Sequence, residues 1–137
     1  YNVQYEKESR SNTPNTFAIY MMSRVFKWCL DEFGSLAEVE KYNEEKAAFI
    51  YDTIDNSDGF YIPHARTQDR SIMNITFRCT TDELDKQFLA EADAAGFSTL
   101  AGHRSIKGMR ASIYNAMPKE GCEQLAAFMK AFQQSNS

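Results

Sequence analysis

Cysteine and histidine are scarce in this chain of 137 residues, which holds three cysteines and two histidines. Cys29, Cys79 and Cys122 lie far apart and form no C-x-x-C pair. A structural zinc site needs four well-spaced ligands, so we predict no metal site. An odd number of unpaired thiols is typical of a reducing compartment, which favours the cytoplasm.

Long apolar runs and an excess of positive charge are also absent. The longest apolar run, residues 17–22, is too short to span a bilayer, and no secretory signal peptide is visible. Lys and Arg total 15 against 19 Asp and Glu, which gives a formal net charge of −4. Because a net-acidic domain binds phosphate backbones poorly, we predict no nucleic-acid partner. The short apolar run likewise predicts no membrane span.

Apolar side chains are plentiful enough for one domain with its own core, at 43% of the chain. Helices are predicted over residues 16–33, over 36–54, from the capping box at 80–83 to about 95, and from 118 to a frayed tail that begins at 133. Strands are predicted over 60–62, 72–78, 98–101 and 109–115. This order predicts an α+β fold, with a small, mostly antiparallel sheet of three to four strands and helices packed on one face.

The predicted helix over 16–33 is apolar on almost every side, because only Arg24, Lys27 and Asp31 form a polar stripe. Such a helix is normally buried on most sides, which a domain of this size has difficulty achieving. We expect part of its surface to pack against a second domain or a partner subunit. If that surface stays exposed, we expect self-association through residues 17–30.

A basic loop is the strongest candidate for a functional site. His103, Arg104 and Lys107 lie in a loop flanked by glycines, and Arg110 follows in the next predicted strand. Glycine lets a loop approach a ligand closely, and arginine pairs bidentately with carboxylate or phosphate. The spacing of the loop alone favours a solvated turn. A strand arginine, however, favours an anionic partner, either a protein carboxylate or a small phosphorylated or carboxylated ligand.

Asn12 and Thr13 are a weaker candidate. They precede the first long helix, where an amide and a hydroxyl can bind a phosphate at the helix N-terminus. The same residue types are typical of a turn and a helix cap.

Several stretches of the sequence resemble phosphoserine aminotransferases. Residues 102–118 (GHRSIKGMRASIYNAMP) are similar to the C-terminal signature of that family, and residues 12–17 (NTPNTF) are similar to its segment entering the small domain. Residues 55–57 and 70–75 also match, and the resemblance runs in order from about residue 12 to 132. It implies a C-terminal small domain over 16–137, preceded by a segment, 1–15, that leads from a large domain outside this chain.

The resemblance also implies an activity. Family members are homodimeric transaminases of fold type I that depend on pyridoxal 5′-phosphate. They exchange an amino group between glutamate and 3-phosphohydroxypyruvate, giving phosphoserine and 2-oxoglutarate in serine biosynthesis, and some bacterial members act in pyridoxine biosynthesis. The lysine that binds the cofactor lies upstream in the family. The 137-residue chain is therefore expected to be inactive alone and to bind no cofactor covalently.

Site residues carry over from the resemblance position by position. Asn12 and Thr13 match the pair that binds the cofactor phosphate of the partner subunit. His103 and Arg104 match residues that help to hold the substrate phosphate. Arg110 matches the arginine that binds the substrate α-carboxylate.

Two positions depart from the family pattern, since Lys107 stands where glycine is usual and Asn15 where proline is common.

Two other functions also stay open. A free-standing domain that senses a small anion would be favoured by an initiator Met directly before Tyr1 in the gene. A fold-type-I transaminase for an unphosphorylated amino acid is disfavoured by the adjacent histidine and arginine at 103–104, because such an enzyme has no substrate phosphate to hold.

Overall fold

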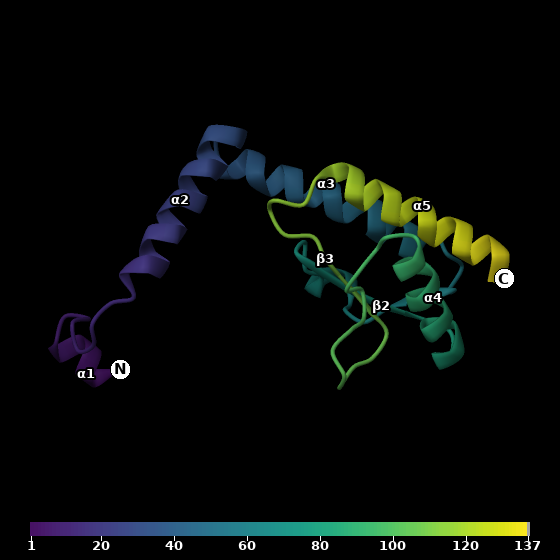
Figure 1. Cartoon of the computed structure of the whole chain (residues 1–137), viewed down its shortest axis with the longest axis horizontal. Helices are drawn as coiled ribbons and strands as arrows, with labels where there is room; N and C mark the ends of the chain where they lie inside the picture. The colour runs from purple at the N-terminus through teal and green to yellow at the C-terminus, as the bar shows by residue number, and fades with distance from the viewer. Residues whose placement is uncertain (137) are drawn as a thin grey trace. The chain divides into compact units, whose positions relative to one another are not determined.

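The computed structural model describes residues 1–136, which cluster into two compact units, Tyr1–Val39 and the chain from Glu40 onward. The first unit holds α1 (Asn2–Glu6), α2 (Thr16–Phe33) and the first residues of α3 (Leu36–Asp55). The second holds the rest of α3, the strands β1 (Tyr61–Pro63), β2 (Asn74–Cys79) and β3 (Met109–Ser112), the 3₁₀ helix η1 (Thr67–Asp69), and the helices α4 (Asp82–Ala94) and α5 (Lys119–Asn136) (Figure 1).

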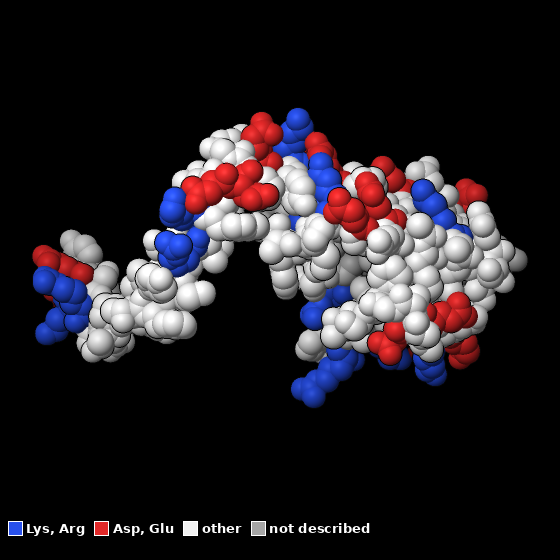
Figure 2. Space-filling model, turned by 45° about the horizontal axis from the view of Figure 1, so that its top comes forward, with Lys and Arg blue, Asp and Glu red and all other residues white. Residues whose placement is uncertain are grey.

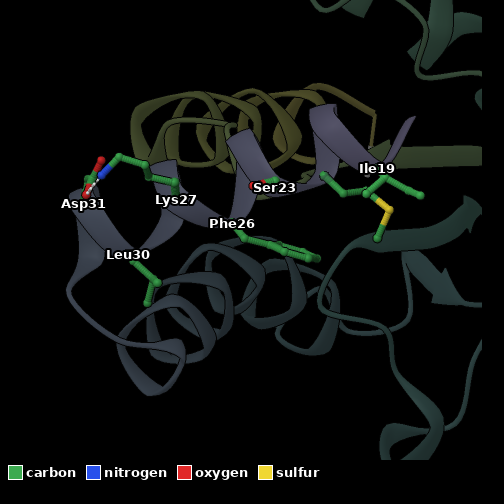
Figure 3. A pocket seen from close by; sticks show the side chains of 7 residues that line it. Ile19, Ser23, Phe26, Lys27, Leu30 and Asp31 are labelled. Carbon is green, nitrogen blue, oxygen red and sulfur yellow. Dashed lines mark hydrogen bonds and ion pairs between the residues drawn. The ribbon is translucent and has the colours of Figure 1, made fainter. Parts of the chain in front are cut away.

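The helix α2 carries an exposed apolar surface. Within α2, all of which the structure describes, Cys29 is the only buried residue. Phe17 is 72% exposed and Phe26 is 59% exposed. The side chains of Ile19, Phe26 and Leu30 line a hollow of about 520 Å³ (Figure 3). The expected exposure of this helix is confirmed, while self-association through it stays a prediction.

The three strands form one antiparallel sheet in the order β1-β2-β3. Side chains alternate across this sheet, because successive residues of a strand point to opposite faces. Ile75 of β2 pairs with Ala111 of β3, and both are buried on one face. Thr76 pairs with Arg110 on the opposite face, where Arg110 is exposed.

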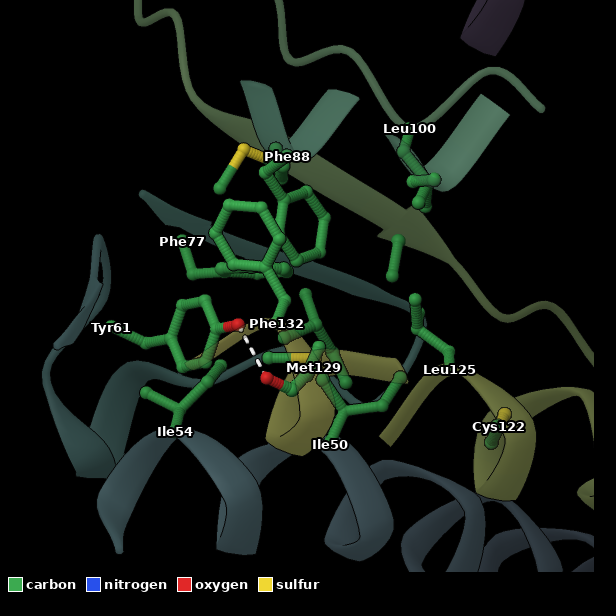
Figure 4. Packing of buried hydrophobic residues seen from close by; sticks show 14 of the residues in the cluster. Ile50, Ile54, Tyr61, Phe77, Phe88, Leu100, Cys122, Leu125, Met129 and Phe132 are labelled. Atoms are coloured by element: carbon green, nitrogen blue, oxygen red, sulfur yellow. Dashed lines mark hydrogen bonds between the residues drawn. The ribbon is translucent and has the colours of Figure 1, made fainter. Parts of the chain in front are cut away.

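The core lies between the buried face of the sheet and the helices α3, α4 and α5, which all contribute to a single apolar cluster. Phe88 of α4 is fully buried and meets the rings of Tyr61 and Phe77 edge-on at 6.0 and 5.8 Å (Figure 4). Such aromatic pairs add about 0.5–1.5 kcal/mol each beyond their buried area. The Tyr61 hydroxyl donates to the Met129 carbonyl at 2.7 Å, which ties β1 to α5. The predicted α+β fold, with helices on one face of a small antiparallel sheet, is confirmed.

Two predictions of local structure were wrong. Residues 98–101 form a turn with one isolated bridge, Ala101 to Met109, because Thr99 has a φ of +62° that interrupts an extended strand. The tail does not fray at 133, since α5 continues to Asn136. The Asn136 side chain holds this end, donating to the Phe132 carbonyl at 2.8 Å and accepting from Gln87 at 3.1 Å.

Other differences are smaller. Helical spacing favours Leu36 and Ala95 on the inner faces of their helices, but both are exposed, Leu36 at the first position of α3 and Ala95 just after the last residue of α4. The strands begin or end one to three residues away from the predicted limits, and α1 and η1 had no prediction. Among the described residues, no helix combines the length and apolar character that a membrane crossing requires. Residues 1–136 also contain no group of three or more side chains placed to hold a metal ion.

Candidate anion-binding site

Arg110 lies on the open face of the sheet, near the start of β3. Its N–H donates to the Leu100 carbonyl at 2.7 Å, which fixes the backbone at this position. Its side chain is exposed and, within residues 1–136, makes no ion pair or hydrogen bond with another residue. Of the two partners that the sequence left open, a protein carboxylate is therefore excluded among the described residues. The guanidinium stays available for an anionic ligand.

A cavity of about 410 Å³ opens beside β3. Arg110 and Ser112 line it from the strand, Ser98 and Thr99 from the preceding turn, and Gln124 from α5. Its lining mixes hydroxyl, amide and guanidinium groups with apolar side chains, a composition common in sites for small molecules.

The loop between Gly102 and Gly108 is closed at its base by a hydrogen bond of 2.8 Å from the Gly102 N–H to the Gly108 carbonyl. A Cβ at Gly102 would lie 2.3 Å from the Lys107 carbonyl oxygen, and one at Gly108 would lie 2.6 Å from the Phe77 carbonyl oxygen. Gly108 also has a φ of +63°. Both glycines are therefore required because the protein's own backbone approaches them closely, while the expected approach to a ligand stays a prediction.

The loop side chains point into solvent. His103 is exposed, and its Nδ1 accepts a hydrogen bond from the Ser105 N–H at 3.3 Å. Arg104 is exposed and forms no side-chain bond with the other described residues. Lys107, by contrast, pairs with Asp82 at 3.1 Å. In Figure 2, Lys and Arg side chains project from the lower edge of the second unit. Within residues 1–136, neither His103 nor Arg104 forms an ion pair with a carboxylate.

Asn12 and Thr13 belong to the first unit, where both are exposed. The cap of α2 comes from Asn15, whose Oδ1 accepts from the Ala18 N–H at 3.0 Å. Asn15 thereby accounts for the capping role that the sequence left open for its neighbours. The amide of Asn12 and the hydroxyl of Thr13 make no hydrogen bond with other residues in the described part of the chain.

A buried lysine that sequence reasoning missed lies beneath the end of β3. Lys46 is 0% exposed, and its Nζ donates to the carbonyls of Ile113 at 3.2 Å, Tyr114 at 2.7 Å and Met117 at 3.2 Å. Burial lowers the pKa of the Lys46 ammonium, and the nearby Cys122 thiol raises it by a smaller effect. Three carbonyls replace the lost water, so Lys46 fixes the segment that joins β3 to α5.

Residues 55 and 70 form an ion pair, and both lie in stretches that resemble phosphoserine aminotransferases. Arg70 donates to the two carboxylate oxygens of Asp55 at 2.7 and 2.5 Å, and its guanidinium lies 4.4 Å from the centre of the Tyr51 ring. The hydrogen bond from Arg70, together with its charge, lowers the pKa of Asp55. These two residues therefore join the end of α3 to the start of β2 and do not contribute to the anion site.

Comparisons with known proteins show which family the chain resembles. The chain matches the family described as Aminotransferase class-V over residues 1–125. Curated phosphoserine aminotransferases from Lysinibacillus sphaericus and Bacillus subtilis share 56% and 53% sequence identity with the chain, each over 99% of its length. The chain spans only 37% and 38% of the length of those relatives.

Solved structures give the same result. The phosphoserine aminotransferase from Bacillus circulans subsp. alkalophilus covers 100% of the chain at 47% identity, with a TM-score of 0.86 and 38% of its own length matched. A phosphoserine aminotransferase from Trichomonas vaginalis, bound to PLP, covers 95% at 36% identity, with a TM-score of 0.78 and 37% of its length matched. With the match over residues 1–125, these findings place the chain in the class-V aminotransferase family.

Proposed function

We propose that this chain is the C-terminal small domain of a phosphoserine aminotransferase, with the domain proper over residues 16–137 and a leading segment over 1–15. The reaction transfers an amino group between glutamate and 3-phosphohydroxypyruvate, giving phosphoserine and 2-oxoglutarate. The observation that carries this proposal is Arg110, an arginine fixed on a strand with no partner among the described residues. Arg104, six residues earlier in the sequence, is equally unpaired among the described residues, and two such arginines suit a substrate with two separate anionic groups.

The two cationic groups have different roles in this proposal. Arg110 binds the α-carboxylate, which phosphoserine and glutamate share, and so contributes to both half-reactions. His103 and Arg104 bind the substrate phosphate, which only phosphoserine and its keto acid carry. Two fixed anchor points restrict rotation of the substrate and hold its Cα–H in one orientation for proton transfer.

Pyridoxal 5′-phosphate is the cofactor of this proposal, and it supplies the electron sink for amino-group exchange. The residues that fit it here are Asn12 and Thr13, because their amide and hydroxyl are unpaired within the described chain and precede the N-terminus of α2. The partial positive charge of that helix end favours a phosphate. Lys46 is occupied by three carbonyls, and we infer that the cofactor lysine lies in a part of the enzyme outside residues 1–137.

We further infer a cytoplasmic homodimer that serves serine biosynthesis and, in some bacteria, pyridoxine biosynthesis. The exposed apolar surface of α2 supports a packing partner, because a large patch of exposed apolar side chains often marks an interaction site. The 137-residue chain alone is expected to self-associate through this surface. Light scattering on the wild-type chain and on Phe26→Gln, with Arg24→Gln as the polar-stripe control, should show that only Phe26→Gln shifts the species toward monomer. A wild-type chain that is strictly monomeric at high concentration contradicts the inference.

The function is tested by the two half-reactions of the holoenzyme that contains this chain. Arg104→Ala should slow the phosphoserine half-reaction roughly ten- to a hundredfold, because a charge-assisted hydrogen bond contributes about 1.5–3 kcal/mol. The glutamate half-reaction should fall much less. Single-turnover absorbance of the cofactor measures both rates, with Arg66→Ala, an exposed arginine of η1's N-cap, as the matched control. Equal losses with both substrates would show that Arg104 does not bind the phosphate.

A further inference from the structure

An ion pair ties the anion loop to a neighbouring helix. Asp82, the first residue of α4, accepts from Lys107 of the loop at 3.1 Å and from Arg78 of β2 at 3.0 Å. The hydrogen bond from Lys107 and its charge lower the pKa of Asp82, so the carboxylate is ionised at neutral pH. Asp82 thus occupies a position between the sheet and the loop, with one oxygen facing each.

The helix end that carries Asp82 is itself fixed. The Thr81 hydroxyl accepts from the Leu84 N–H at 3.2 Å and caps α4. Asp85 is buried, and its Oδ1 accepts from the Cys79 N–H of β2 at 2.6 Å. One capping bond and one hydrogen bond to a buried carboxylate therefore join the start of α4 to the core, which makes Asp82 a rigid attachment point.

The loop has few other attachments. Its backbone is closed by the bond between Gly102 and Gly108, and the Lys107 N–H donates to the His103 carbonyl at 2.8 Å. Within residues 1–136, the pair of Lys107 and Asp82 is the only ion pair or side-chain hydrogen bond that joins the loop to the rest of the chain. Asp82 and Lys107 both line a hollow of about 300 Å³ between α4 and the loop base.

Lys107 is also held in an unusual backbone conformation, with a φ of +62° that L residues seldom adopt. A lysine at such a position is disfavoured by local sterics, and among the described residues its side chain forms a polar contact only with Asp82. The contact to Asp82 therefore selects the loop conformation in which Lys107 turns toward α4. His103 and Arg104 remain directed to solvent, unpaired with any protein carboxylate among the described residues.

We propose that Asp82 is a positioning residue, which holds Lys107 and thereby preorganises the loop that presents His103 and Arg104 to the substrate phosphate. This inference rests on the proposed function. A loop that is ordered before binding loses less conformational entropy when the anion arrives, so affinity for the phosphorylated substrate rises. The pair is exposed, and exposed pairs contribute modestly. We therefore expect an effect of roughly two- to fivefold on KM and none on kcat.

The sign of the effect separates this role from a simple charge effect. If Asp82 acted only as a nearby negative charge, Asp82→Asn would strengthen the attraction of the loop for phosphate and lower KM. If Asp82 positions the loop, the same change raises KM for phosphoserine and leaves KM for glutamate unchanged. Asp93→Asn is the matched control, because Asp93 is exposed on the same helix, loses the same charge and has no side-chain bond in the described chain.

The experiment measures kcat and KM for each half-reaction of the holoenzyme in Asp82→Asn, Lys107→Met, the double variant and Asp93→Asn. The expected result is a KM for phosphoserine raised roughly two- to fivefold in both single variants and no further in the double variant. An unchanged or lower KM in Asp82→Asn, or an equal rise for glutamate, overturns the proposal.

A second measurement does not depend on catalysis. Amide hydrogen exchange of residues 106 and 107 in the 137-residue chain should be faster in Asp82→Asn than in Asp93→Asn, and equal rates overturn the proposed role. If the holoenzyme turns over glutamate but not phosphoserine, the proposed function is wrong. The exchange measurement would still test whether Asp82 orders the loop.

Discussion

The positively charged side chains on the two sides of strand β3 differ in their burial and in their partners. On the helix side, Lys46 is fully buried and gives three hydrogen bonds to carbonyls just beyond the strand. On the open side, Arg110 is exposed and has no partner among residues 1–136. A buried ammonium must be satisfied by the protein, because leaving it unpaired away from water is costly. A fixed cation without a protein partner is instead available to a ligand. The difference in partners therefore separates a residue of the fold from a residue of the site.

Apolar side chains show the same contrast between the two units. In the second unit, the apolar faces of three helices meet in one cluster around Phe88. In the first unit, α2 exposes Phe17, Phe26 and their apolar neighbours. Large exposed apolar surfaces of this kind are typical of interaction sites.

The largest effect on stability is expected on the helix side of β3. Lys46→Ala removes the only ammonium that serves three carbonyls and should lower the free energy of unfolding by roughly 2–4 kcal/mol. Lys41→Ala, on the exposed face of the same helix, should change it by less than about 0.5 kcal/mol. Urea unfolding of the 137-residue chain measures both. Equal unfolding midpoints for the two variants would show that the hydrogen bonds of Lys46 do not stabilise the fold.

A smaller effect is expected at the pair of Asp55 and Arg70. Asp55 is about half exposed, so the pair should contribute only about 0.5–1 kcal/mol at pH 7. Because Arg70 lowers the pKa of Asp55, this contribution is complete above the usual Asp value and is lost as pH falls through the lowered one. Asp55→Asn should therefore be less stable than wild type at pH 7, and the gap should close toward pH 2. Asp52→Asn on the same helix is the control, and a gap that persists at pH 2 would mean that packing, not charge, explains the loss.

Sequence periodicity could predict most of the second unit. Alternation in the sequence puts Met109 and Ala111 on one face of the strand and Arg110 on the other, and burial in β3 follows this period of two. The same reasoning failed at residue 99, where a threonine with φ of +62° breaks the expected strand. Nothing in the residue type signals that conformation.

Lys46 shows what a sequence pattern cannot predict. It lies among glutamates and lysines that are typical of a solvated helix face, and its burial depends on carbonyls more than 60 residues away in sequence. The one available signal was its spacing, four residues before Ile50 and eight before Ile54, on the apolar face of α3. The pairing of Lys107 with Asp82 is likewise set by tertiary contact, since 25 residues separate them.

The central claim is that Arg110 serves a ligand and not the fold, and one variant measured in two ways tests it most directly. Arg110→Ala in the holoenzyme should leave the free energy of unfolding within about 0.5 kcal/mol of wild type, because no described residue loses a partner. Both the phosphoserine and the glutamate half-reactions should slow by roughly tenfold or more, since both substrates present an α-carboxylate. A variant that unfolds more easily, as expected for Lys46→Ala, while keeping both rates would contradict the account.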